Sequence, residues 1–176
     1  MRGGMTERDV TKEALGIISA ASFLPRLVVF DLDYTLWPFY CECSSKRETP
    51  YLYPEAKSIL NALKKKDVKM AVASRTPTPE IARTFLNKLG LTNLFVDLEI
   101  FPSWTHKTDH FKNIHEKTSI PFNSMLFFDD EYRNIKSVSQ MGVTSVHVDD
   151  GVNIKALKKG LTDFARSQNQ LTSNSS

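Results

Sequence analysis

The sequence predicts an α/β fold, a Rossmann-like doubly wound parallel sheet of about five strands with helices on both faces. Two observations support this fold class. Short apolar runs rich in β-branched or aromatic residues alternate along the 176-residue chain with longer stretches that carry apolar residues at helical spacing. In addition, 41% of the residues are hydrophobic and 24% are charged, which is typical of one globular domain with an ordinary core.

The apolar runs are the expected strands. All but the irregular third have the pattern of strands that are buried on both faces of a parallel sheet. In chain order the runs are Leu27–Phe30, Val68–Ala73, Leu94–Ile100, Met125–Phe128 and Thr144–Val148.

A helical pattern follows each of these runs. Pro54 opens the first helix, and Thr78 with Pro79 starts the second. Gly90 and Gly142 lie where the second and fourth helices should end. The stripes of apolar residues expected to face the sheet are Ala56, Ile59, Leu60 and Leu63; Ile81, Phe85, Leu86 and Leu89; Phe111 and Ile114; Ile135, Val138 and Met141; and Ile154, Leu157, Leu161 and Phe164.

The two ends of the chain differ from this pattern. Residues 1–22 form an N-terminal extension that is too acidic for a transit peptide and has too short an apolar stretch for a signal peptide, so we expect a short helix over residues 6–21. Residues 23–166 form the main domain. Residues 167–176 are Ser, Asn, Gln and Thr with one Leu, and we expect this C-terminal tail to be flexible.

Composition excludes several classes of partner. The net charge of +3, from 23 basic and 20 acidic residues, is too small to indicate a nucleic-acid or membrane partner. No apolar stretch approaches the roughly 20 residues that span a bilayer. Cys41 and Cys43 provide neither a disulfide framework nor a zinc ribbon, which favours a reducing compartment. We therefore expect a soluble cytoplasmic monomer.

Polar side chains follow the strands at the point where each one ends. In an open parallel sheet, ligands bind beyond the carboxyl ends of the strands, so these side chains should converge on one edge. Lys107 follows the third run. The other sets are Asp31-Leu32-Asp33-Tyr34-Thr35 after the first run, Ser74-Arg75-Thr76 after the second, and Asp129-Asp130-Glu131 after the fourth.

This grouping of acids, a hydroxyl and an ammonium indicates phosphate chemistry. Clustered carboxylates repel one another and need a cation, and aspartate oxygens without His or thiolate suit Mg²⁺. With that charge neutralised, Asp31 can attack a phosphoryl group whose oxygens contact Lys107, the Ser74 hydroxyl, and the backbone N–H groups of Leu32 and Asp33. Asp33 is close enough to protonate the leaving oxygen and later to deprotonate water.

These motifs resemble those of a known family. The stretch Asp31-Leu32-Asp33-Tyr34-Thr35 matches the first signature of the haloacid dehalogenase-like (HAD) phosphatase superfamily, and Ser74, Lys107 and the pair Asp129-Asp130 match the next three in order. The stretches LVVFDLDYTLWPF, ASRT and LFFDDEYRNI are similar to the magnesium-dependent phosphatase family, and the similarity covers residues 24–166.

The resemblance implies roles for particular residues. Asp31 is the nucleophile and a metal ligand, and Asp33 is the acid/base that also offers its backbone carbonyl to Mg²⁺. Ser74, Arg75 and Lys107 contact phosphate, and Thr35 braces the loop. Asp130 aligns best with the remaining metal ligand and Asn134 with its supporting residue, while Asp129 is the competing choice.

Substrate and alternatives remain open at this point. Only the short segment Trp37–Tyr53 could cover the site, so we expect a capless, open enzyme. Phosphoprotein and small-molecule substrates both fit, and the resemblance implies phosphotyrosine and phosphorylated sugar adducts such as fructosamine phosphates. The alternative is a phospho-accepting receiver-type signalling module without turnover.

Three further groups have two interpretations each. His106 and His110 are spaced to share a zinc ion on a helix, but ordinary packing is favoured because the pattern His-Glu-x-x-His is absent. Trp37, Phe39 and Tyr40 form either an aromatic wall for the substrate or a buried cluster. Cys41 and Cys43 are interpreted as surface-loop residues.

Overall fold

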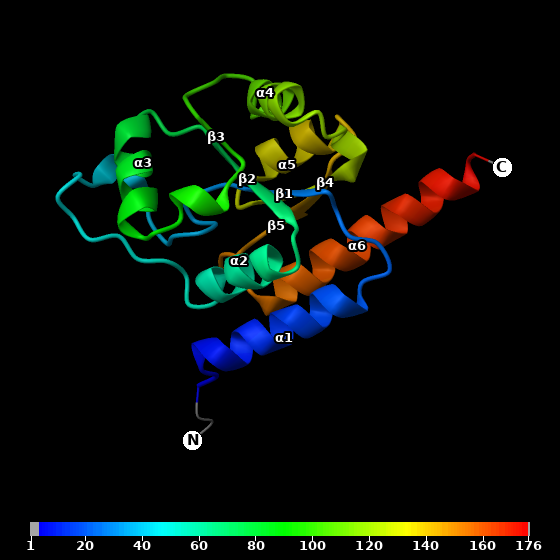
Figure 1. Cartoon of the computed structure of the whole chain (residues 1–176). Coiled ribbons are helices and arrows are strands. Elements are labelled where there is room, and N and C mark those ends of the chain that lie inside the picture. The colour runs from blue at the N-terminus through cyan, green and yellow to red at the C-terminus, as the bar shows by residue number, and fades with distance from the viewer. Residues whose placement is uncertain (1–3, 176) are drawn as a thin grey trace.

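The structure, a computed structural model that describes residues 4–175, contains a five-stranded parallel sheet in the order β3-β2-β1-β4-β5 (Figure 1). The predicted α/β class with a parallel sheet is thus confirmed. Strand β1 is central, so its carboxyl end lies between those of β2 and β4. The strands are β1 (Leu27–Phe30), β2 (Lys69–Ser74), β3 (Asp97–Ile100), β4 (Met125–Asp129) and β5 (Thr144–His147).

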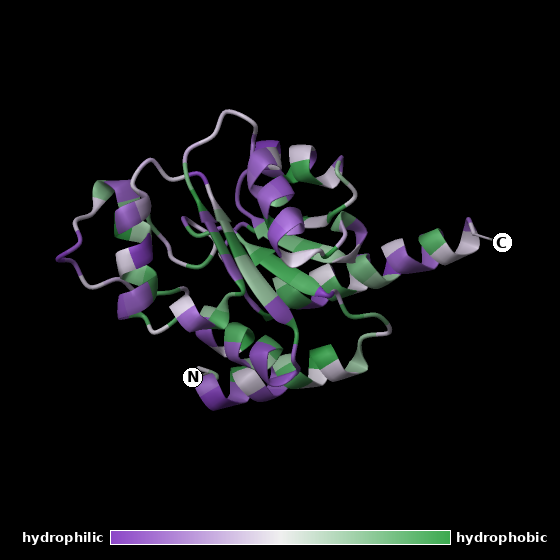
Figure 2. Cartoon of the chain, turned by 45° about the horizontal axis from the view of Figure 1, so that its top comes forward, coloured by the Kyte–Doolittle hydropathy of each residue, from purple (hydrophilic) through white to green (hydrophobic). Residues whose placement is uncertain are grey.

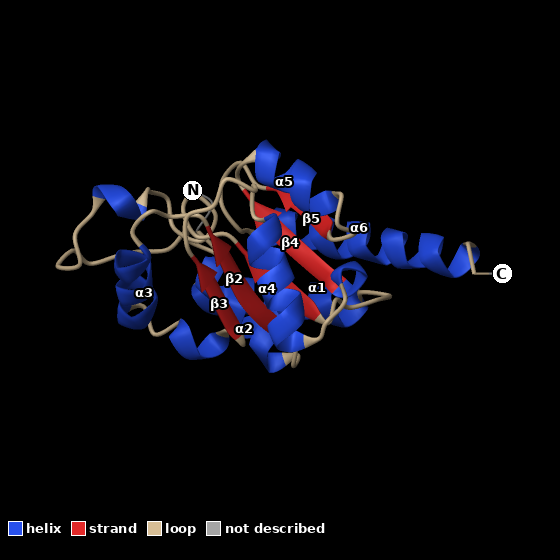
Figure 3. Cartoon of the chain, turned by 90° about the horizontal axis from the view of Figure 1, so that it is seen from above, coloured by secondary structure: helices blue, strands red, loops and turns tan. Residues whose placement is uncertain are grey.

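Helices cover both faces of the sheet (Figures 1 and 3). The alternating side chains of the strands point to opposite faces, which gives two separate apolar clusters. In the larger cluster, Val28 and Phe30 of β1 meet α2, α3 and α6, and in the smaller one Leu27 and Val29 meet α4 and α5. The helices are α1 (Glu7–Ala20), α2 (Ala56–Lys65), α3 (Pro79–Lys88), α4 (Thr108–Thr118), α5 (Tyr132–Ser139) and α6 (Ile154–Ser173).

Helix α1 forms an outer layer. It packs on α2 and α6 rather than on the sheet, and its apolar residues Ala14 and Ile18 complete the larger cluster (Figure 2). Thr6 begins the helix with a capping box, because its hydroxyl accepts from the Asp9 N–H at 3.2 Å while the Asp9 carboxylate accepts from the Thr6 N–H at 3.1 Å. The N-terminal extension is therefore joined to the domain by packing.

Most element boundaries lie within one or two residues of the prediction, and two differ by more. The third strand begins at Asp97 instead of Leu94, because Thr92–Leu94 forms a 3₁₀ turn before the chain enters the sheet. Helix α6 continues to Ser173, so most of the expected irregular tail is helical (Figure 1). Elongation adds one hydrogen bond for each residue fixed, which lets a packed helix extend past its last buried turn. None of the described helices is long and apolar enough to cross a membrane.

Candidate active site

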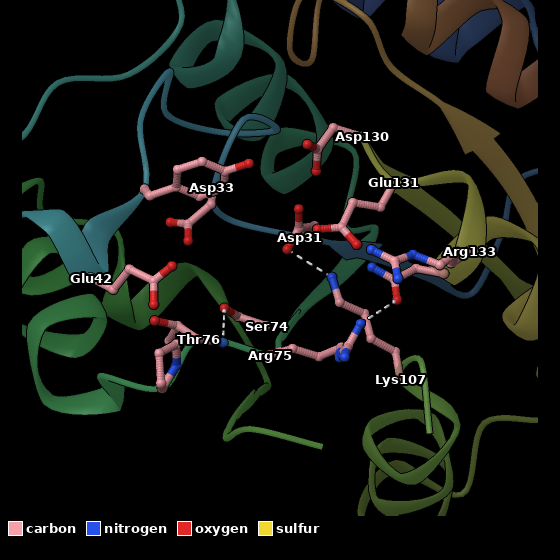
Figure 4. Close-up of a pocket in the computed structure, with 13 residues that line it drawn as sticks. Asp31, Asp33, Glu42, Ser74, Arg75, Thr76, Lys107, Asp130, Glu131 and Arg133 are labelled. Atoms are coloured by element: carbon pink, nitrogen blue, oxygen red, sulfur yellow. Dashed lines mark hydrogen bonds and ion pairs between the residues drawn. The ribbon is translucent and has the colours of Figure 1, made fainter. Parts of the chain in front are cut away.

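The carboxyl ends of β1, β2 and β4 form the floor of a cavity of about 220 Å³ (Figure 4). Asp31 directly follows β1, Ser74 ends β2 and Asp130 directly follows β4. The structure thus brings together the side chains that the strand ends predicted. The lining contains five acids and three bases: Asp31, Asp33, Glu42, Asp130 and Glu131, with Arg75, Lys107 and Arg133.

Three carboxyl groups meet on this floor. Asp31, Asp129 and Asp130 each offer an oxygen, and these atoms all lie within 4.8 Å of one another. Burial and the neighbouring Asp31 carboxylate raise the pKa of Asp130 to about 9, and the same two causes raise the pKa of Asp129. Both shifts reflect a local excess of negative charge that a divalent cation would relieve.

Lys107 supplies positive charge from beneath these acids. Its ammonium nitrogen lies 2.7 Å from Asp31 Oδ1 and 2.5 Å from Asp129 Oδ2, and its side chain is fully buried. Burial disfavours the charged amine, but the carboxylates of Asp129 and Asp31 outweigh it and raise the pKa of Lys107. The residue has a left-handed backbone (φ 76°) just before helix α4, which turns the side chain back toward the sheet.

The acidic pair after the fourth strand divides into two environments. Asp129 is fully buried, and its oxygens accept hydrogen bonds from the Glu131 N–H (2.8 Å) and the Asn134 amide (3.1 Å). Asp130 lines the cavity, where its carboxyl group faces that of Asp31. Asn134 therefore supports Asp129 directly and not Asp130, which differs from the role that the resemblance implies.

The loop after β1 positions Asp31 and presents free donors. Thr35 donates to Asp31 Oδ2 at 3.1 Å, and the Thr35 and Leu36 N–H groups return to the carbonyl of Leu32. Within the described part of the chain, the N–H groups of Leu32 and Asp33 donate to no protein acceptor. Two adjacent free donors beside a carboxylate form a concave site for an anion.

Asp33 lies on the wall of the cavity. Its Oδ1 accepts from the indole N–H of Trp37 at 2.7 Å and from the N–H of Cys41 at 3.2 Å. Burial raises the pKa of Asp33, and these hydrogen bonds only partly oppose the shift. A carboxyl group that retains its proton more readily than usual is suited to acid/base work.

Ser74 and Arg75 complete the side facing β2. Ser74 is buried to 2% exposure, and its hydroxyl oxygen accepts from the Thr76 N–H at 3.4 Å. Arg75 donates to the carbonyl of Ser103 at 2.9 Å and to Asn134 Oδ1 at 3.3 Å, so its guanidinium is held by neutral groups. Its charge remains available for an anion in the cavity.

The histidine pair does not form a zinc site. His106 Nδ1 lies 3.3 Å from the Arg75 guanidinium, whereas His110 Nε2 lies 2.9 Å from the Ser74 carbonyl and 2.8 Å from the Phe101 carbonyl. Because both partners are acceptors, Nε2 of His110 carries the proton. His110 therefore joins α4 to the ends of β2 and β3, which confirms the packing interpretation.

The segment that follows the loop after β1 contains the aromatic group and both cysteines of the sequence. Trp37 is buried and stacks on Phe39 (ring centroids 5.6 Å apart), which agrees with the buried-cluster interpretation. Tyr40 is 48% exposed and lines the cavity, so a contact of its ring with the substrate stays a prediction. The surface-loop interpretation of Cys41 is wrong, because its thiol is buried against Thr76. Burial raises the pKa of the Cys41 thiol to about 12. Cys43 is exposed as expected.

Further charged residues line the cavity that the sequence patterns did not indicate as site residues. Glu42 and Arg133 line the cavity, beside Glu131 of the set after the fourth strand. The positions of Glu131 and Arg133, directly after the fourth strand's acids, were a usable signal. Glu42 had none, since only the fold of its loop brings it to the site.

The donor set fits magnesium. Asp31, Asp130 and the backbone carbonyl of Asp33 would hold the ion, because Mg²⁺ binds hard oxygen donors where negative charge is in excess. Among the described residues, Asp31, Asp129 and Asp130 are the group whose ligand atoms lie close enough together to hold a metal ion. The predicted chemistry of the donors therefore agrees with their arrangement.

Comparison with known proteins agrees with this arrangement. The family model described as Acid Phosphatase matches residues 23–51 and 45–167. The human (Homo sapiens) magnesium-dependent phosphatase 1 is 41% identical over 160 residues, which cover 82% of this chain and 90% of that protein. A HAD-like hydrolase superfamily protein of Schizosaccharomyces pombe is 37% identical over 144 residues, which cover 68% of this chain and 83% of that protein.

A solved structure shares the fold. A HAD-superfamily hydrolase from Ehrlichia chaffeensis superposes with a TM-score of 0.66 at 15% identity, over 82% of this chain and 99% of that one. At this level of identity the likeness concerns the fold alone. The superposition therefore supports the overall arrangement of the sheet and helices.

Proposed function

Because this chain belongs to the acid phosphatase family, and is a magnesium-dependent phosphatase of the HAD superfamily, we propose that it hydrolyses phosphomonoesters through a phosphoaspartyl intermediate on Asp31. The observation that carries the proposal is the meeting of Asp31, Asp33 and Asp130 with Lys107 in one cavity. Nucleophile, acid/base, metal ligand and phosphate-binding ammonium are thereby within reach of one phosphoryl group.

In the first step, a carboxylate oxygen of Asp31 forms a bond to phosphorus while the bond from phosphorus to the leaving oxygen breaks. Thr35 and Lys107 hold the Asp31 carboxylate in place. Asp33 donates its proton to the leaving oxygen, which departs as an alcohol or phenol. The free N–H groups of Leu32 and Asp33, with Ser74 and Arg75, bind the oxygens of the phosphoryl group.

In the second step, Asp33 takes a proton from a water molecule as that water attacks phosphorus. The bond between phosphorus and Asp31 breaks, inorganic phosphate leaves, and both aspartates return to their starting state. When bound at the aspartate cluster, Mg²⁺ supplies the positive charge that lets a carboxylate and a phosphate approach each other. We assign the third acidic ligand to Asp130, since Asp129 is occupied by Lys107, Asn134 and the Glu131 N–H.

The proposed substrates are phosphotyrosine in proteins and phosphorylated sugar adducts such as fructosamine phosphates. No separate domain covers the cavity among residues 4–175, and the segment Trp37–Tyr53 forms only one wall of it. An open site can admit a side chain presented by another protein as well as a small molecule. The exposed ring of Tyr40 at the wall suits either an aromatic ring or a sugar. We propose that the enzyme works as a cytoplasmic monomer, and a reducing compartment suits its two free thiols.

The receiver-type alternative does not fit the topology. A receiver module carries its acceptor aspartate after the third strand of a sheet ordered 2-1-3-4-5. In this protein Asp31 follows the first strand, and the order is β3-β2-β1-β4-β5. A second aspartate beside the first also favours turnover over storage of the phosphoryl group.

The test is phosphate release from a simple aryl phosphate. The purified protein should release phosphate only with Mg²⁺ present, and Asp31→Asn should abolish release while its circular dichroism spectrum shows that the variant is folded. Full turnover by Asp31→Asn would refute the mechanism. A parallel screen of phosphotyrosine peptides against phosphorylated sugar adducts then selects the substrate class by kcat/KM.

A further inference from the structure

The two oxygens of the Asp33 carboxyl group have different surroundings. Oδ1 accepts two hydrogen bonds, from the Trp37 indole at 2.7 Å and from the Cys41 N–H at 3.2 Å. Among the described residues, Oδ2 has as its partner only the thiol of Cys41 at 3.9 Å, a distance at which a sulfur donor is weak. The carboxyl group faces the space between Asp31 and Glu42 (Figure 4). One oxygen is therefore fixed by the protein, and the other is available to the cavity.

Trp37 is a rigid donor. Its side chain is fully buried, stacks in parallel on Phe39 and meets Phe85 of α3 edge to face, with ring centroids 5.9 Å apart. The backbone is fixed as well, because the Tyr34 N–H donates to the Trp37 carbonyl at 2.7 Å and the Trp37 N–H to the Leu32 carbonyl at 3.3 Å. The ring and backbone contacts thus fix the orientation of the indole, with its N–H pointing at Asp33.

A buried tryptophan usually satisfies its N–H with some acceptor, so the contact alone could serve only the stability of the core. Two features favour a role in the reaction. The acceptor is a carboxylate that lines the cavity instead of a backbone carbonyl, and a second donor, the Cys41 N–H, binds the same oxygen. Together they fix the rotation of the carboxyl group, which a purely structural contact does not require.

We propose that Trp37 is a positioning residue for proton transfer: its indole N–H, with the Cys41 N–H, holds Oδ1 of Asp33 and reserves Oδ2 as the oxygen that carries the proton. This inference rests on the proposed function, since it assumes that Asp33 is the acid/base. In the first step the Oδ2–H bond breaks and the leaving oxygen takes the proton as its bond to phosphorus breaks. In the second step Oδ2 takes a proton from the attacking water.

The inference predicts a dependence on the leaving group. An alkoxide leaving group needs a well-placed acid, whereas a phenolate with electron-withdrawing substituents departs without protonation. Loss of the Trp37 donor should therefore lower kcat/KM strongly for an alkyl phosphate and weakly for an activated aryl phosphate. A variant that only loosens the core should lower both to the same degree.

The experiment compares Trp37→Phe with the wild type on a series of phosphomonoesters that ranges from an alkyl phosphate to a dinitrophenyl phosphate, with Mg²⁺ present. We expect kcat/KM to fall about 10- to 100-fold for the alkyl ester and less than about 3-fold for the dinitrophenyl ester. Phe39→Leu is the matched control, because it disturbs the same ring stack and keeps the indole N–H. It should change kcat/KM evenly across the series.

Asp33→Asn separates the two hypotheses. If Asp33→Asn retains full activity on the alkyl ester, the proposed function fails. If Asp33→Asn loses that activity and Trp37→Phe changes all esters evenly, only the role of Trp37 is refuted. Should Trp37→Phe not fold, a benzothienyl alanine at position 37 keeps the shape of the indole and replaces its N–H by sulfur, and the same uneven loss is expected of it.

Discussion

Asp31 and Asp129 are two buried carboxyl groups that share the ammonium of Lys107. Breaking a buried ion pair leaves an uncompensated charge in a poorly solvated site, so such a group of three is held as a unit. The arrangement fixes the Asp31 carboxylate at the end of β1 and leaves one side of it to the cavity. At the scale of single residues, stability and chemistry thus depend on the same contacts.

His110 gives a prediction for the pH dependence of stability. Burial and the nearby Lys107 charge lower the pKa of His110 to about 4 from an ordinary value of 6.5. Between these two values the unfolded chain binds more protons than the folded chain, so the free energy of unfolding should fall as the pH falls from 6.5 to 4. The loss attributable to His110 is about 3 kcal/mol at most.

The measurement is urea unfolding at several pH values for the wild type and for His110→Gln, which keeps an N–H donor and does not titrate. The wild type should lose more stability than the variant across this window. Parallel curves for the two proteins would show that His110 does not titrate with a lowered pKa.

The sequence predicted most site residues, and the reasons for the exceptions are physical. Asp31 and Asp130 directly follow β1 and β4, Ser74 ends β2, and Lys107 stands just before the helix after β3. The parallel sheet brings these strand ends together whatever the loops do. The burial of Cys41 was missed, because it depends on how an irregular loop folds back over the core. The partner of Asn134 was missed as well, since one turn of helix after β4 can face either acid of the pair.

At the scale of elements, regular spacing was the reliable signal. Strand β1 begins and ends at the residues predicted, and Gly90, with φ 70°, lies just past α3 as a left-handed cap. The third strand was the exception, because the 3₁₀ turn Thr92–Leu94 has the same apolar and polar composition as a strand end. Helix α6 extends to Ser173, well past its packed turns. The residues of this extension are almost all polar, so no apolar spacing in the sequence predicted that they are helical.

Two glycines test the packing of helices on the sheet. A Cβ at Gly160 of α6 would lie 2.8 Å from Cζ of the buried Phe128 ring, whereas a Cβ at Gly16 of α1 would meet nothing within 4 Å. Gly160→Ala should therefore lower the free energy of unfolding by about 1–2 kcal/mol through overpacking. Gly16→Ala should raise it by about 0.5–1 kcal/mol, because alanine costs less entropy in a helix.

Chemical denaturation of the two variants checks this pair against the wild type. The control is internal, since both substitutions add one methyl group to a helix. Equal effects on stability would contradict the close approach of α6 to β4.

At the scale of the whole molecule, the sheet gathers its functional groups at one edge and adds no separate covering domain within residues 4–175. The fold places Asp31 on the central strand, where neighbours on both sides contribute to the site. Because the cavity is open, it can admit both a phosphorylated protein side chain and a small phosphorylated molecule. Selectivity between them then depends on contacts that the substrate makes outside the cavity.

Magnesium should stabilise the whole molecule. A ligand that binds only the folded chain raises the free energy of unfolding, by about 2.7 kcal/mol at a concentration 100 times its Kd. The melting temperature of the wild type should therefore rise with added Mg²⁺, and Asp130→Asn should remove most of that rise. Glu131→Gln, which removes a neighbouring charge, is the control and should keep it. An equal response of wild type and Asp130→Asn would rule out Asp130 as a ligand.

The most direct test of the account is the identity of the phosphorylated residue during turnover. Rapid quenching of the enzyme with substrate and Mg²⁺, followed by borohydride reduction, converts an aspartyl phosphate to homoserine, which peptide mass spectrometry locates. A phosphoaspartyl intermediate on Asp31 should give homoserine at position 31, and none in Asp31→Asn. Conversion at another aspartate, or turnover of the wild type with no modified residue under conditions that trap acyl phosphates, would contradict it.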